Sequence, residues 1–449
     1  MAQRPPTQEA TYLEAFQELQ RNGHAQDPAW VKSLRDEAIL KFGDLGFPVT
    51  RRGNEEWKYT NVGPIARVPF RPAAAQVKLQ NADLQHLGLG ESAKHRLVFI
   101  DGSYAPGLSS VAALPAGVRV ADLAEAMDSS PVLLREHLTR HASGEANAFI
   151  ALNTAFVHHG AFVHIPDGIR VEEPILLLFL NTARDEDTVS HPRVLVITGR
   201  ESEATLIESH GSLADARYFV NAVAEVVVGQ NSTLRYYTMQ RQSEQAFHVT
   251  NTQAVLDRDA SLSSVNIDLG GGLVRHNLNV LMGAEGASCT LNGLYMTTRS
   301  QHVDNQVVID HAKGHTTTRE LYKGILDGKS RTVFHGSIIV REGARKVDAN
   351  QSDKNLLLSD QAEADTKPAF WIYCDDVKCA HGASCGQIDE EALFYMRSRG
   401  IGDREARSLL VRGFVSEIVD SIEYEPYRTH VDGLVKSTLR EWLEGGEAA

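Results

Sequence analysis

The sequence is poor in cysteine and contains neither a long hydrophobic run nor a basic run. Four cysteines in 449 residues exclude the dense disulfide framework of a small secreted domain, so we expect free thiols in the reducing cytoplasm. The longest apolar run, residues 175–180 (ILLLFL), is far too short to span a bilayer. The first residues, MAQRPP, lack the apolar stretch of a signal peptide. We therefore expect no membrane partner.

The charge balance argues against nucleic acid as a partner. Lys and Arg number 45 and Asp and Glu number 58, which gives a net charge of −13, whereas phosphate binding needs a basic surface. The composition, 42% hydrophobic and 23% charged, is ordinary for a soluble globular protein. The length is sufficient for two or three domains.

Three kinds of hydrophobic pattern follow one another along the chain. Helical periodicity comes first, with Tyr12, Phe16 and Leu19 on one face. From about residue 150 the alternation typical of strands replaces it, and helical spacing returns after residue 388. We therefore predict an N-terminal helical or mixed region over residues 1–145, a β body over 146–388 and a C-terminal helical domain over 389–449.

The β body contains a loose internal repeat. An apolar strand, a polar turn with Gly or Asp and a further strand recur about every 25–30 residues, a period that indicates stacked supersecondary units. Few helical intervals separate these strands, which favours a β-solenoid over a parallel sheet with crossover helices. A β-sandwich is the alternative.

Two short motifs resemble catalytic signatures. Residues 324–330 (GILDGKS) have three residues between the glycines where a phosphate loop has four, and a strand pattern follows instead of a helix. We expect a turn there and no ATP site. Residues 382–386 (GASCG) match the nucleophile elbow of an α/β-hydrolase. A serine hydrolase using Ser384 is therefore the alternative from another functional class, although the β body lacks the alternating helices of that fold.

Three of the four cysteines and one histidine lie close together, at Cys374, Cys379, His381 and Cys385. Thiolate and imidazole are metal ligands. In a strand, Cys379 and His381 point to the same face and could ligate one metal together, whereas Cys374 would face away. This pattern predicts a partial site that a partner protein completes. Buried structural cysteines and a satisfied histidine are the alternative.

Several long strings also resemble a known family. They are residues 56–60 (EWKYT), 324–330 (GILDGKS), 355–359 (NLLLS), 364–368 (ADTKP), 375–382 (DDVKCAHG) and 392–400 (ALFYMRSRG). Together they resemble the SufB/SufD family of iron–sulfur cluster assembly proteins, and within it the SufD branch. A SufB-type paralogue is the alternative, but many SufB chains carry an N-terminal cysteine cluster, and the first cysteine here is Cys289.

The resemblance implies a mainly β fold, a right-handed parallel β-helix with helical N- and C-terminal regions. It also implies a non-catalytic scaffold subunit of a SufBCD complex, paired with SufB through the β-helix and bound to the SufC ATPase. An iron–sulfur cluster would form transiently at the SufB interface, and SufC, not this chain, would bind ATP. The isolated chain could form a homodimer. The family's functional Cys and His fall on Cys379 and His381.

The C-terminal helices are the expected docking surface for the ATPase. Their apolar stripes contain Leu409, Leu410, Phe414, Leu434, Leu439 and Trp442. We expect part of each stripe to cover the open end of the β body and the remainder, rimmed by charged residues, to bind SufC.

Overall fold

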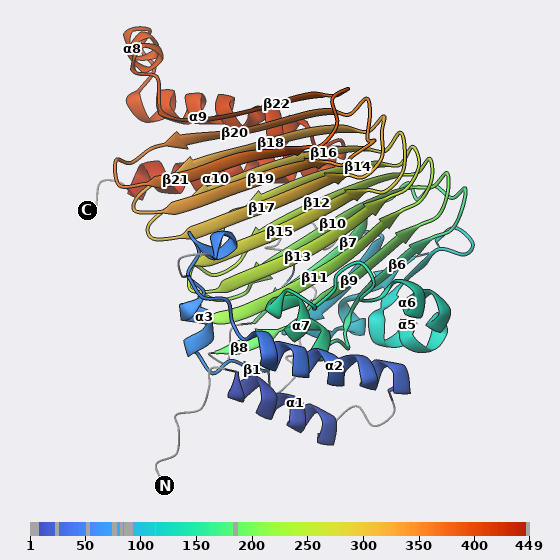
Figure 1. Cartoon of the computed structure of the whole chain (residues 1–449). Helices are drawn as coiled ribbons and strands as arrows, with labels where there is room; N and C mark the ends of the chain where they lie inside the picture. The colour runs from blue at the N-terminus through green and yellow to red at the C-terminus, as the bar shows by residue number, and fades with distance from the viewer. Residues whose placement is uncertain are drawn as a thin grey trace.

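The fold is a parallel β-solenoid with helices against its faces (Figure 1). The computed structural model describes residues 9–22, 27–50, 54–73, 79–80, 84, 93–112, 114–182 and 187–445. Two sheets lie face to face, and the chain alternates between them. The predicted mainly β class, the solenoid and the helical termini are therefore confirmed.

Consecutive main strands belong to opposite sheets, so each later one pairs with the main strand two places before it in the chain. The main strands of the first sheet are β6 (Gly160–Ile165), β9 (Arg193–Thr198), β11 (Tyr218–Val228), β13 (Phe247–Leu256), β15 (Leu273–Met282), β17 (His302–His311), β19 (Arg331–Val340) and β21 (Glu363–Ile372). Those of the second sheet are β7 (Ile175–Asn181), β10 (Glu203–Ser212), β12 (Thr233–Arg241), β14 (Ser261–Asp268), β16 (Ser288–Thr297), β18 (Thr317–Leu326), β20 (Asp348–Leu357) and β22 (Lys378–Gln387).

Shorter strands extend the sheets at the N-terminal end. They are β1 (Arg71–Pro72), β2 (His95–Ile100), β3 (Ser103–Tyr104), β4 (Ser110–Val111), β5 (Arg119–Asp122) and β8 (Thr188–Ser190). Strand β2 pairs parallel with β7, and β5 pairs antiparallel with β6. The proposed division of the chain at residues 145 and 388 stays a prediction.

One turn of the solenoid has close to the length that the repeat predicts. Phe247 lies opposite Leu273 and Leu273 lies opposite His302, which are offsets of 26 and 29 residues, and the turn from Arg331 to Glu363 is longer, at 32. Alternate side chains point between the sheets, and equivalent positions stack into rows. One buried row consists of Val226, Ala254, Val280, Ile309 and Ile338.

The near-match to a phosphate loop is a turn of the solenoid. It joins β18 to β19, and Gly328 adopts a φ of 61°, a conformation that glycine takes at little cost. A Cβ at Gly328 would lie 2.7 Å from the backbone nitrogen of Arg299. The Lys329 N–H donates to the Arg299 carbonyl at 2.6 Å, so this turn stacks on the preceding one. A strand follows where a phosphate loop requires a helix, so the predicted turn is confirmed.

The N-terminal helices lie against the outer face of the first sheet. They are α1 (Ala10–Asn22), α2 (Ala29–Leu45), α3 (Gly63–Arg67), α5 (Leu123–Ser129), α6 (Pro131–His137) and α7 (Ala148–Ala155). The Arg275 guanidinium lies 3.7 Å from the centroid of the Trp57 ring, and the Thr60 hydroxyl donates to Asp304. These contacts hold residues 56–60 to strands β15 and β17.

The C-terminal helices cover the outer face of the second sheet. Tyr427, on α10 (Glu425–Gly445), stacks on Tyr237 at 5.5 Å between ring centroids. The Lys323 Nζ donates to the carbonyl of Phe414, on α9 (Asp403–Asp420), at 2.8 Å. The expectation that these helices cover the open end of the β body is therefore wrong. The apolar outer face of the second sheet, which includes Ile207, Val265, Leu294 and Ile325, takes up their stripes instead.

Candidate functional site

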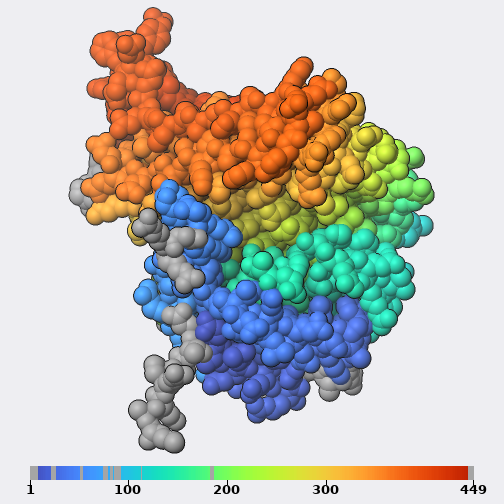
Figure 2. Space-filling model, viewed as in Figure 1, coloured from blue at the N-terminus to red at the C-terminus, as the bar shows by residue number. Residues whose placement is uncertain are grey.

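The last turn of the solenoid leaves one strand edge free in each sheet. In the described part of the chain, β21 pairs only with β19 and β22 pairs only with β20. Trp371 and Tyr373 are exposed beside these edges, at 54% and 64%. Helix α8 (Glu390–Ser398) projects from the body with Phe394 exposed (Figures 1 and 2). Unpaired edges with exposed aromatic side chains are suited to pairing with another chain.

Sequence reasoning did not single out these aromatic residues. The signal was present, because residues 370–373 (FWIY) are four consecutive apolar residues. Strand alternation sends half of such a run outward. Phe370 packs against the interior core, whereas Trp371 is exposed.

Cys379 and His381 lie on the inward face of β22. Cys379 is opposite Ala349, a buried core residue, and packs against the same core. The His381 ring lies 4.4 Å from the ring of Phe370, between centroids. The two side chains share one face, as their spacing predicts. Their role as metal ligands stays a prediction.

The other cysteines are placed differently. Cys374 lies in the turn between β21 and β22, where it packs against the same interior core as Cys379, so the expectation that it would face away from Cys379 and His381 is wrong. Cys385 shares the face of Cys379, but six residues of strand span about 20 Å, too far for both thiols to bind one ion. Cys289 is buried, and burial raises its pKa to about 12.

The described residues contain no group of three or more His, Cys, Asp or Glu side chains that could hold a metal ion. Cys379 and His381 would supply at most two ligands. Burial is the main cause that raises the pKa of the Cys379 thiol. A metal ion that binds this thiol must therefore displace its proton. We call Cys379 and His381 the half ligand set, because they would supply only part of the ligands that a metal ion needs.

A buried polar network lies directly beneath the thiol and imidazole. Gln351 is opposite His381, and its Nε2 donates to Glu320 at 2.8 Å. Asp353 accepts hydrogen bonds from the Tyr295 hydroxyl at 2.9 Å and from the Asn355 amide at 2.7 Å. Burial raises the pKa of Glu320 to about 8 and that of Asp353 to about 6. Glu320 therefore keeps its proton at neutral pH, whereas Asp353 loses its proton at about pH 6.

Replacing Glu320 with glutamine is expected to stabilise the protein at alkaline pH. Between pH 4.5 and about 8 the folded protein keeps the Glu320 proton and the unfolded chain releases it, so this residue's contribution to stability falls as pH rises. Glutamine avoids this loss, and its amide can donate to Gln351 Oε1, which has no partner among the described residues. Urea unfolding should show a gain of about 4–5 kcal/mol at pH 8.5, the equivalent of the raised pKa of Glu320, and almost none at pH 4.5.

The exposed residue Glu342 provides the matched control. Glu342→Gln should give the same difference from wild type at both pH values. A Glu320→Gln variant with equal effects at pH 4.5 and pH 8.5 would show that Glu320 is not a buried protonated group.

The predicted docking residues differ in how far their side chains are exposed. Leu439 is buried, and Leu410, Phe414, Leu434 and Trp442 pack in part against the outer core of the second sheet. Leu409 is 41% exposed. It borders a groove of about 500 Å³ between α9 and α10, together with Arg412, Arg428 and Asp432. Of the six predicted docking residues, Leu409 is the most exposed, and the role of all six in binding a partner stays a prediction.

Ser384 does not have the geometry that the serine hydrolase alternative requires. Ser384 lies within β22, whereas a nucleophile elbow is a sharp turn from strand to helix. Asp389, which follows in chain order, caps α8 by accepting the N–H groups of Glu391 and Ala392. Ser384 is a residue of an edge strand.

No helix within the described ranges is long and apolar enough to cross a membrane. This agrees with the absence of a long hydrophobic run in the sequence.

Comparison with known proteins gives matches over most of the chain. The SufBD core domain of the SUF iron–sulfur cluster assembly system matches residues 179–414, and the SufBD N-terminal region matches residues 6–177. The iron–sulfur cluster assembly protein SufD of Escherichia coli is 32% identical over 85% of this chain and 87% of its own length. A SufBD family protein of Synechocystis is 31% identical over 91% of each chain. SufD of Bacillus subtilis is 25% identical over 96% of this chain and 97% of its own length.

Proposed function

Because the chain belongs to the SufBD family of iron–sulfur cluster assembly proteins, we propose that it is a non-catalytic scaffold subunit in the cytoplasm, paired with SufB and bound to the SufC ATPase. The observation that best supports this proposal is the open end of the solenoid. Two unpaired strand edges lie there beside an inward-facing thiol and imidazole. The iron–sulfur cluster is the cargo of the complex, and SufC binds the ATP.

Pairing with SufB would use the main chain of the free edges. The Lys378 N–H points toward the paired strand β20 and donates to the Val347 carbonyl at 2.8 Å. Backbone groups alternate in direction along a strand, so the N–H groups of Cys379, His381 and Ala383 point to the free edge. A strand of SufB that pairs here would satisfy these donors and cover Trp371 and Tyr373.

Cluster assembly would use the half ligand set. Cys379 and His381 lie on β22, whose second edge pairs with no described strand, and neither Cys374 nor Cys385 is placed to complete a site with them on one strand. A thiolate and an imidazole can bind iron. Ligands from SufB would then close the site, so that the cluster forms only in the assembled pair.

Docking of SufC would use the groove at Leu409. The groove lies on the side of α9 and α10 that faces away from the second sheet, because Val411, Ile418, Val431 and Val435 are buried on the opposite side. It combines an apolar residue with charged side chains on both helices, the composition of a transient protein interface. The two proposed interfaces therefore lie on different parts of the molecule.

Crossed variants separate the two interfaces in one co-purification experiment. Ala383→Pro removes an N–H from the free edge and spares the ladder to β20, so we expect at least about tenfold weaker binding of SufB with SufC retained. Leu409→Asp places a charge in the groove, so we expect at least about tenfold weaker binding of SufC with SufB retained. Each variant is the control for the other.

The co-purified proteins are identified and quantified by mass spectrometry. Loss of both partners in either variant, with the variant still folded by circular dichroism, would contradict two separate interfaces. If the chain purifies only with a second copy of itself, the free edges form a homodimer interface and not a SufB interface.

A further inference from the structure

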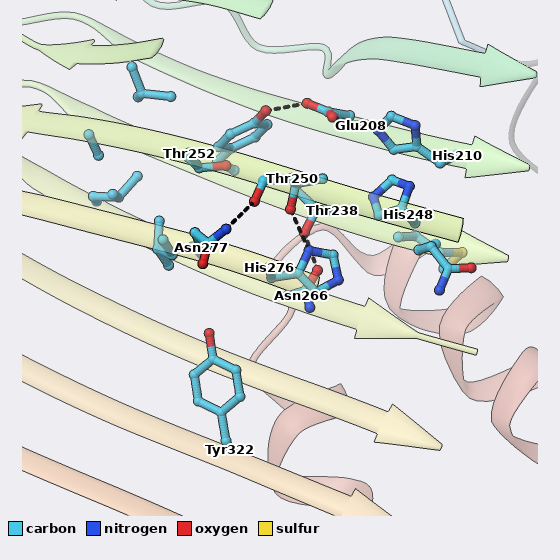
Figure 3. Close-up of a pocket in the computed structure, with 18 residues that line it drawn as sticks. Glu208, His210, Thr238, His248, Thr250, Thr252, Asn266, His276, Asn277 and Tyr322 are labelled. Atoms are coloured by element: carbon cyan, nitrogen blue, oxygen red, sulfur yellow. Dashed lines mark hydrogen bonds and ion pairs between the residues drawn. The ribbon is translucent and has the colours of Figure 1, made fainter. Parts of the chain in front are cut away.

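A cavity of about 60 Å³ lies between the two sheets, several strands away from Cys379 and His381. Side chains of β10, β12 and β14 line it from one sheet, and side chains of β11, β13 and β15 line it from the other. The volume has room for roughly four water molecules. Figure 3 shows His210, His248 and His276 in this space with Glu208 beside them.

The His210 and His248 imidazoles are close enough to share a ligand, and His276 lies next to His248. The ring centroids of His210 and His248 lie 4.9 Å apart, and those of His248 and His276 lie 5.6 Å apart. Two imidazoles bound to one metal ion, with nitrogen–metal distances of about 2.1 Å, also have ring centres about 5 Å apart. The centroid spacing is therefore the one expected for two rings that share an ion.

Carboxylates orient two of these rings. The Glu208 carboxylate lies 2.7 Å from His210 Nε2, and the Asp268 carboxylate lies 2.8 Å from His276 Nε2. A carboxylate on one ring nitrogen is the usual outer partner of a metal-binding histidine, because it fixes the ring and directs the other nitrogen to the ion. The other nitrogen of His276, Nδ1, already lies 2.6 Å from the Thr250 hydroxyl, so this ring orients its neighbours and is not a ligand. His210 Nδ1 and His248 Nδ1 are buried, and neither has a hydrogen-bond partner among the described residues. Leaving each unsatisfied costs about 1–3 kcal/mol, which a ligand would remove.

The charge of the cavity favours a cation. Neither Lys nor Arg is among its lining residues, whereas Glu208 lines it and Asp268 contacts His276. Burial, with repulsion from His210 and His276, lowers the pKa of His248 well below its ordinary value.

We propose that this cavity binds one divalent transition-metal ion of the class that prefers imidazole ligands, through His210 and His248. No three ligating groups of the described residues already form a metal site, so water in the remaining space completes the coordination. His276 and Glu208 stabilise the ion from beside it. This site is separate from the cluster at the open end and does not depend on SufB or SufC.

Binding is tested on the isolated full chain with Zn²⁺ and Co²⁺. The metal-free protein is titrated with ZnCl2 by calorimetry, and Co²⁺ is followed through its visible absorption. Protein grown with added zinc is also analysed for metal, because entry to an enclosed cavity can be slow. We expect one equivalent per chain, and at least about tenfold weaker binding in His248→Gln and in the double variant His210→Gln/His248→Gln.

His315→Asn, at an exposed bend between β17 and β18, is the control, and it should bind the ion as wild type does. Glu208→Gln keeps a hydrogen-bonding side chain at the cavity wall and should still weaken binding, so the test does not depend on variants that fold poorly. Equal stoichiometry in wild type and the double variant, or no bound ion in wild type under any of these conditions, would overturn the proposal and leave the cavity with ordered water only.

Discussion

Replacing Glu225 with glutamine is expected to lower the free energy of unfolding by about 3–5 kcal/mol, because it leaves a buried guanidinium without its counter-ion. Glu225 and Arg193 form an ion pair in which both side chains are 0% exposed. The Glu225 carboxylate also accepts the backbone N–H groups of Thr139, His141 and Ala142, at 2.7, 2.9 and 3.1 Å.

The same pair connects three parts of the fold. Arg193 begins β9 and donates to the side chains of Asn153 and Thr154 on α7, at 3.1 and 3.2 Å. Thr139 has a φ of 65°, a conformation that costs energy for a residue with a branched side chain, and its N–H bond to Glu225 helps to hold it. A neutral amide at residue 225 would turn one acceptor into a donor that faces other donors.

Urea unfolding at pH 7 measures this effect. The control is Glu285→Gln, because Glu285 and Arg258 form a pair at 3.6 Å in which both side chains are more than half exposed. Such surface pairs contribute about 0–1 kcal/mol, so the control should remain near wild type. Losses of equal size in the two variants would show that burial does not determine the strength of the Glu225 pair.

The largest functional effect is expected at the open end of the solenoid. In the complex with SufB and SufC, His381→Ala and Cys379→Ser should each reduce the yield of assembled cluster by about tenfold or more, because each removes one ligand from a half set. The visible absorption of the cluster, measured per mole of complex after reconstitution, gives the yield. Growth of a strain that lacks the gene, complemented by each variant under iron limitation, provides a second readout.

Two variants on the same strand are the controls. Ser384→Ala changes an outward position of β22, and Cys385→Ala changes an inward position about 20 Å from Cys379. Both should assemble clusters nearly as wild type does. Co-purification of SufB must be unchanged in all four variants, so that a lost interface is not mistaken for a lost ligand. Equal cluster yields in His381→Ala and Ser384→Ala would show that His381 is only a structural residue.

Local spacing accounts for the part of the site that could be predicted. Residues two apart in a strand share a face whatever surrounds the strand, so the common face of Cys379 and His381 could be inferred from their numbers alone. The same argument fails for Cys374, because its position depends on where β21 ends and the turn begins.

The sequence by itself determined the repeat length, the alternation of the strands and the turn at residues 327–330, because these depend on neighbouring residues. Only the tertiary structure decided which surfaces meet. An amphipathic helix needs an apolar surface, but its periodicity does not say which one, so the position of α9 and α10 on the second sheet could not be predicted. His210, His248 and His276 lie on three different strands, and they meet because turn length and sheet order stack those strands at one level. That register is a property of the assembled solenoid, since each turn is positioned by the one before it.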